Sequence, residues 1–140
     1  MKSLVVTAAD EAFAPLMSDL LDSLEPHKDA LSISVACCDL GLAPATREVF
    51  SGRVTHLVAP EWPFRPPEKF SSQRKNLSRA VRPFLPRLVP GYDAYIWIDA
   101  DAWVQKAIGL QWLIQATRYA DLAAIPTLHR SYAMQPRDNE

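Results

Sequence analysis

The sequence predicts an α/β domain with a Rossmann-like, mainly parallel sheet flanked by helices. Short apolar or β-branched runs begin near residues 4, 31, 54, 92 and 121, and amphipathic segments with helical spacing separate them. Parallel strands need a crossover connection, usually a helix, so this alternation favours a parallel sheet. The 140 residues are 49% hydrophobic and 22% charged, which is typical of a single globular domain.

Charge and cysteine content exclude several classes of protein. The formal net charge of −1 argues against a general nucleic-acid binder. The apolar run at residues 4–6 is too short for a signal peptide or a transmembrane segment. The two cysteines, Cys37 and Cys38, are adjacent and are predicted to be small buried residues in a reducing compartment. We therefore expect a cytoplasmic protein without a membrane span.

The first predicted strand covers residues 4–7, and the first helix follows a loop. Pro15 fits the first turn of a helix that begins near Phe13 or Ala14. Residues 7–12 are then expected to form an exposed loop. Its small residues, Thr7, Ala8 and Ala9, would let a ligand approach the backbone.

The second strand is predicted at residues 31–38 and ends at Asp39. Asp39 could accept a hydrogen bond from a base or a ribose, or it could cap the turn that follows. Pro44 suits the first position of a short helix, and Gly52 suits the C′ position after it. A third strand is expected at residues 53–58.

A helix beginning near Ser71 is predicted to be basic on one face. Lys75, Arg79 and Arg82 fall at positions i, i+4 and i+7, while Pro83 must kink or end the helix. The basic face has two interpretations: a solvated helix surface, or a cationic partner for a diphosphate through Lys75 or Arg79.

The last third of the chain holds the main candidate site. Residues 94–98 predict a strand buried on both faces, and it ends at Asp99, Ala100 and Asp101. Alternation in an extended segment would put both carboxylates on one side, where they could bind a hard cation such as Mg²⁺ or Mn²⁺. The alternative is a pair of solvated carboxylates at a strand end. A helix at 107–119 and a strand at 121–126 are predicted to follow, so the domain would span residues 1–134, with a polar tail at 135–140.

Three segments together resemble the family 8-like glycosyltransferases of the GT-A fold. They are the first strand running into Thr7, the sequence DLGL at residues 39–42, and YIWIDAD at residues 95–101. The resemblance covers the nucleotide-sugar-binding half of such an enzyme. It implies transfer of a sugar from a nucleotide-sugar, with a UDP-sugar favoured, to a saccharide or another hydroxyl acceptor.

The resemblance also implies roles for individual residues. Asp99 and Asp101 would hold Mn²⁺ or Mg²⁺ between the two phosphates, with Asp99 also near the donor ribose. The other donor-binding residues would be Thr7, Ala8, Ala9, Asp39, Lys75, Arg79 and Ala100.

Two departures from the family pattern keep other functions open. His129 lacks the His-x-x-Gly context in which the family carries its third metal ligand, and little of the chain is left for an acceptor site. A truncated, non-catalytic binding module is one alternative, with a possible homo-oligomer covering exposed apolar surface. A haloacid-dehalogenase-like phosphatase is another, because that family also places Asp-x-Asp after a buried strand.

Overall fold

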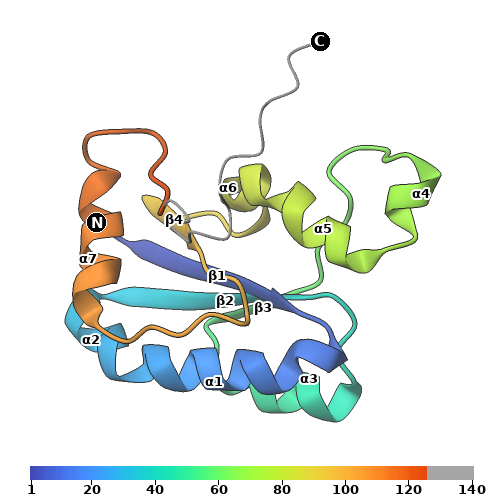
Figure 1. The fold of residues 1–140 in the computed structure, drawn as a ribbon, viewed down its shortest axis with the longest axis horizontal. Helices are drawn as coiled ribbons and strands as arrows, with labels where there is room; N and C mark the ends of the chain where they lie inside the picture. Colours follow the sequence, from blue (N-terminus) through green and yellow to red (C-terminus); the bar gives the residue numbers. More distant parts are fainter. Residues whose placement is uncertain (126–140) are drawn as a thin grey trace, which may run out of the picture.

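Four strands form one parallel sheet in the order β3-β2-β1-β4 (Figure 1). The strands are β1 (Ser3–Ala9), β2 (Ile33–Asp39), β3 (His56–Val58) and β4 (Ala94–Trp97). All three strand pairs are parallel. This computed structural model, which describes residues 1–125, confirms the predicted α/β class and the Rossmann-like parallel sheet.

Helices cover both faces of the sheet, which gives three layers (Figure 1). On one face lie α1 (Ala14–Leu24), α3 (Pro44–Ser51) and α7 (Ala107–Ala116). On the other lie α5 (Arg74–Val81) and α6 (Leu85–Leu88). The shorter elements are η1 (Glu11–Phe13), η2 (Glu25–His27), α2 (Lys28–Leu31), α4 (Glu68–Ser71) and η3 (Arg82–Phe84).

The central strand β1 is buried on both sides. Val5 packs with Leu20 of α1 in one hydrophobic cluster, while Leu4 and Val6 pack with Leu77 of α5 in the other. Burying each such side chain contributes about 1.5–3 kcal/mol. The two clusters together hold the carboxyl ends of the strands in fixed positions.

The prolines have the positions that the sequence predicts. Pro15 and Pro44 occupy the first turns of α1 and α3. Pro83 lacks a backbone N–H, and α5 ends at Val81 and continues as the 3-10 turn η3. Gly52 differs from the prediction, because it is the C-cap of α3 with a right-handed φ of −79° rather than a left-handed C′ residue.

The predicted loop at residues 7–12 is wrong in its first part. Thr7, Ala8 and Ala9 continue β1 and pair with Cys37, Cys38 and Asp39 of β2. Only residues 10–13 turn away from the sheet. The sequence predicted the end of the strand at Thr7 because two alanines follow it, and alanine is depleted in strands. In the structure, pairing with β2 keeps these alanines extended.

Two predicted strands also differ from the structure. The third is shorter than 53–58, because Arg53 and Val54 donate their N–H groups back to Phe50 at the end of α3. Residues 121–125 form no strand, and Ile125 is exposed. The predicted boundary at 134, the tail at 135–140 and His129 lie outside the described residues. Within residues 1–125, no helix combines the length and the apolar character needed to cross a membrane.

Candidate functional site

A cavity of about 450 Å³ opens where β1 and β4 end. Within the sheet, β2 and then β3 lie to one side of β1. The chain then crosses back and adds β4 on the other side of β1. Open α/β sheets bind ligands at such a switch point, beyond the carboxyl ends of the strands. The cavity is lined by Ala8, Ala9, Asp10, Phe13, Leu40, Lys75, Ser78, Arg79, Arg82, Asp99, Ala100 and Asp101.

Most of the residues predicted as donor or metal contacts line this one cavity. They are Ala8, Ala9, Lys75, Arg79, Asp99, Ala100 and Asp101. Thr7 and Asp39 do not line it. Ala8 and Asp101, about ninety positions apart in the sequence, therefore line the same cavity. The cavity lies at the carboxyl ends of the strands, where open α/β sheets bind ligands.

The Asp-x-Asp segment forms a turn rather than an extended strand end. Ile98 still donates its N–H to Val6 of β1, but the chain then bends, and Ala102 N donates to Asp99 O at 3.0 Å. Ala100 points into the core beneath the turn and is 4% exposed. The alternation argument for Asp99 and Asp101 was thus wrong, yet both carboxylates line the cavity because the turn exposes them.

Asp99 is held by two donors, Arg82 from the cavity wall and Trp97 at the end of β4. Its Oδ1 accepts from Arg82 Nη2 at 2.7 Å and from Trp97 Nε1 at 2.8 Å. The Arg82 guanidinium also lies over the Trp97 ring, 4.5 Å from its centroid. Both contacts are made by Oδ1 of Asp99, while Asp101 forms no ion pair within residues 1–125.

One wall of the cavity is basic. Lys75 and Arg79 come from α5, and Arg82 follows at the start of η3. Leu77 and Val81 bury the opposite side of α5 against the sheet, which turns the cations toward the cavity. The amphipathic pattern predicted this basic face, but Arg82 was not placed in the site from sequence. Its only signal is the i, i+7 spacing from Lys75.

The opposite wall is the turn after β1. Asp10 accepts a hydrogen bond from Phe13 N at 3.1 Å and so caps η1. This cap presents Phe13 at the cavity, where its side chain is 45% exposed. Sequence reasoning missed both residues, because Phe13 fitted the apolar spacing of the following helix.

Thr7 is fully buried, and its Oγ1 has no hydrogen-bond partner among the described residues. Side chains alternate along β1, so Thr7 lies on the same face as Val5, beneath the cavity floor. The prediction that Thr7 belongs to an exposed ligand-contact loop is therefore wrong. A ligand in the cavity would meet Ala8 and Ala9 instead.

Asp39 caps the turn after β2, which was one of its two predicted roles. Its Oδ1 accepts from Gly41 N and Leu42 N, both at 2.8 Å, and its Oδ2 pairs with Arg47 at 2.6 Å. Burial by itself raises the pKa of this carboxyl, but the hydrogen bonds from Leu42 and Gly41 and the charge of Arg47 outweigh it. The pKa of Asp39 is lowered as a result. The Asp39 carboxylate therefore stabilises the turn after β2 and does not line the cavity.

The carboxylates that face the cavity suit a hard divalent cation as a pair. Asp101 and the second oxygen of Asp99 offer oxygen ligands beside a space large enough for a phosphate group. No cluster of three or more Asp, Glu, His or Cys side chains suited to a metal occurs among residues 1–125. The described residues thus offer carboxylate oxygens at the cavity but no complete set of protein ligands for a metal.

The fold and this site together define a protein with a GT-A glycosyltransferase-like fold. A solved structure of the galactosyltransferase LgtC, in complex with donor and acceptor sugar analogues, matches 78% of the chain with a TM-score of 0.56 and 20% sequence identity. A structure of an active-site mutant of LgtC matches the same share with a TM-score of 0.57 and 20% identity.

Both matched structures are of longer chains than this one. The chain spans 41% of the length of each LgtC structure. No protein-family model matches the sequence, and no curated protein matches it above the significance threshold. The likeness at this identity establishes the fold alone, and the phosphatase alternative stays a prediction.

Proposed function

We propose that the cavity binds the nucleoside diphosphate part of a nucleotide-sugar, and that the chain is the donor-binding part of a metal-dependent glycosyltransferase. The observation that carries this proposal is the meeting of Asp99 and Asp101 with three cations at the switch point of the sheet. A metal–diphosphate complex presents both signs of charge, and this cavity offers a partner for each.

Asp101 and Asp99 are the proposed ligands for Mn²⁺ or Mg²⁺. Asp101 forms no ion pair within residues 1–125, and Trp97 and Arg82 both bond Oδ1 of Asp99, so its other oxygen could bind the ion. When bound, the cation would act as a Lewis acid that neutralises charge on the departing nucleoside diphosphate, a contribution of several kcal/mol.

The cations on α5 are proposed to bind the phosphate oxygens. Lys75 and Arg79 line the cavity, and neither forms an ion pair with a carboxylate within residues 1–125. Arg82 differs, because Asp99 already engages it. We therefore assign Lys75 and Arg79 to the diphosphate, and Arg82 to holding the acidic turn in place.

Phe13, Ala8 and Ala9 are proposed to contact the nucleoside. An exposed aromatic ring at a cavity wall can stack on a base, and small residues at a strand end let a ribose approach the main chain. A UDP-sugar is the favoured donor, with a saccharide or another hydroxyl compound as acceptor. The non-catalytic binding module and a cytoplasmic location stay predictions.

Calorimetric titration of UDP in the presence and absence of Mn²⁺ tests the proposed function. We expect the wild-type chain to bind UDP more tightly with Mn²⁺, because Asp99 and Asp101 would hold the cation and its charge would favour the phosphates. Asp101→Ala should remove most of this gain, and affinity should fall by about tenfold or more, the equivalent of one lost charge-assisted contact.

Asp19→Ala is the matched control, since Asp19 is an exposed carboxylate on α1 outside the cavity. It should bind UDP and Mn²⁺ as the wild type does. Equal UDP affinity for wild type and Asp101→Ala, with and without Mn²⁺, would contradict the proposal.

A further inference from the structure

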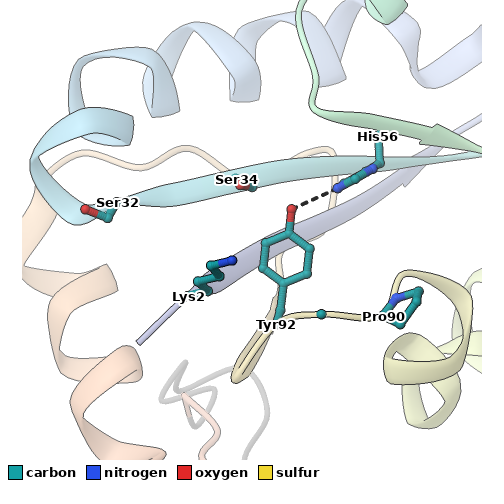
Figure 2. A pocket seen from close by; sticks show the side chains of 7 residues that line it. Lys2, Ser32, Ser34, His56, Pro90 and Tyr92 are labelled. Carbon is teal, nitrogen blue, oxygen red and sulfur yellow. Dashed lines mark hydrogen bonds between the residues drawn. The ribbon is translucent and has the colours of Figure 1, made fainter.

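A second cavity, of about 330 Å³, lies at the opposite edge of the sheet (Figure 2). Lys2, Ser32, Ser34, His56 and Tyr92 supply its polar side chains. Each of these residues immediately precedes a strand or lies near its beginning. The seven residues of β1 at about 3.3 Å each separate the two cavities by roughly 20 Å, so this is a different site from the proposed donor cavity.

The strand register brings these side chains together. His56 of β3 pairs with Ala36 of β2, and Ser34 lies two residues earlier on the same face of β2. Tyr92 comes from the turn before β4 and reaches across β1, where its hydroxyl lies 2.8 Å from His56 Nε2 (Figure 2). The two rings meet edge to face with centroids 5.8 Å apart, so they form one braced wall.

The backbone of Lys2 is also fixed. Its N–H donates to Asp93 Oδ2 at 2.7 Å, and its carbonyl accepts from Asp93 N at 2.8 Å. The Asp93 carboxylate thus bonds the main chain, and Asp93 is not among the residues that line the cavity. The Lys2 ammonium forms no ion pair within residues 1–125.

The lining is rich in donors and contains no Asp or Glu side chain. An ammonium has donors only, and two serine hydroxyls can donate. His56 and Tyr92 share one hydrogen bond, so the pair has one further donor, either the imidazole Nδ1–H or the tyrosine O–H. A metal ion would find no carboxylate here, whereas an anion with several oxygens would find a partner for each of them. The composition therefore selects for a small oxyanion.

We propose that this cavity binds a phosphate group, with Lys2 as the charge partner and Ser34 and His56 as hydrogen-bonding partners. The ligand is either inorganic phosphate or the terminal phosphate of a small phosphomonoester. The site does not depend on the proposed donor cavity, because no residue lines both.

Site-resolved NMR titration of the full chain with inorganic phosphate tests this proposal. We expect saturable amide shifts at Ser32, Ser34 and His56, in addition to any shifts at the basic wall of the donor cavity. Lys2→Met should lower the phosphate affinity measured at these three amides by about tenfold, since it removes one charge-assisted hydrogen bond. His56→Gln is a second variant that keeps a polar side chain and should weaken binding less.

Lys69→Met is the matched control, because Lys69 is an exposed lysine of α4 that lines neither cavity. It should leave the phosphate affinity unchanged. Repeating the titration with glycerol phosphate separates the sources: equal binding assigns a phosphomonoester, and binding of phosphate alone assigns the free ion. Shifts confined to the donor cavity, or equal phosphate affinity in wild type and Lys2→Met, would overturn the proposal.

Discussion

Asp99 and Asp101 are two positions apart and have different surroundings. Trp97 and Arg82 hold Asp99 in one orientation, whereas Asp101 has no such partner in the described part of the chain. A pair of this kind combines one oriented ligand with one adaptable ligand. We therefore expect Asp101 to contribute more to metal affinity, because its carboxylate has no protein donor to give up.

Arg79 provides a test of the basic wall. We expect Arg79→Ala to weaken binding of UDP by about tenfold and binding of uridine far less, because the guanidinium meets phosphate oxygens that uridine lacks. Calorimetry with both ligands measures the difference. Arg65→Ala, which removes an exposed arginine outside the cavity, should leave both affinities unchanged. Similar losses for UDP and uridine would place Arg79 outside the phosphate site.

Asp39 provides a test of the fold. Asp39→Ala leaves the N–H groups of Gly41 and Leu42 without their acceptor and removes the ion pair with Arg47. We expect the free energy of unfolding to fall by about 2–4 kcal/mol, since Leu42 is buried. Urea unfolding at neutral pH measures it.

Asp22→Ala serves as the control for Asp39, because it breaks a surface ion pair with Arg53. Such exposed pairs contribute about 0–1 kcal/mol. If Asp39→Ala were no more destabilising than Asp22→Ala, the structural role of Asp39 would be wrong.

At the scale of the elements, much of the fold could be predicted from local sequence. Pro15, Pro44 and Pro83 fix helix boundaries through their own backbone chemistry, and the apolar run before Asp99 gives a strand. The predicted burial on both faces is wrong, because only Ala94 and Ile96 are buried, while Tyr95 and Trp97 are half-buried. The basic face of α5 also follows from spacing alone. These features depend on a few neighbouring residues, so a single sequence reveals them.

Other features depend on partners far along the chain and could not be predicted in this way. Ala8 and Ala9 are extended because β2, about thirty residues later, pairs with them. The contact between Arg82 and Asp99 joins residues that sequence spacing does not associate.

Glu11 links two loops at the carboxyl edge of the sheet. Its Oε2 accepts from Ala43 N at 2.7 Å and its Oε1 accepts from Thr46 Oγ1 at 2.8 Å, so it connects η1 to the start of α3. The hydrogen bonds from Ala43 and Thr46 lower the pKa of this carboxyl. A lowered pKa in the folded state means that the stabilisation is present above the ordinary pKa and is lost as pH falls through the folded value.

We therefore expect Glu11→Ala to lower the melting temperature at neutral pH, with a difference from wild type that shrinks as the pH falls below the ordinary carboxyl range. Thermal unfolding followed across this pH range measures the effect. Glu48→Ala, at an exposed position on α3, should show a smaller and less pH-dependent change. A Glu11→Ala difference that persists at acid pH would show that the link does not act through the carboxylate.

At the scale of the whole molecule, the parallel sheet separates two chemically different edges. The carboxyl edge carries carboxylates with cations, and the amino edge carries donors without a lining carboxylate. The two hydrophobic clusters on either face of β1 keep these edges apart. The arrangement follows from the strand order, which opens the switch point between β1 and β4.

Paramagnetic broadening by Mn²⁺ in the presence of UDP tests the central claim most directly, because it locates the ion in the fold. We predict that amide signals of Ala9, Ser78 and Ala100 broaden, that signals of Ser34 and His56 at the other edge stay sharp, and that Asp101→Ala abolishes the effect. Broadening that is absent from the carboxyl-edge residues, or that survives unchanged in Asp101→Ala, would contradict the account.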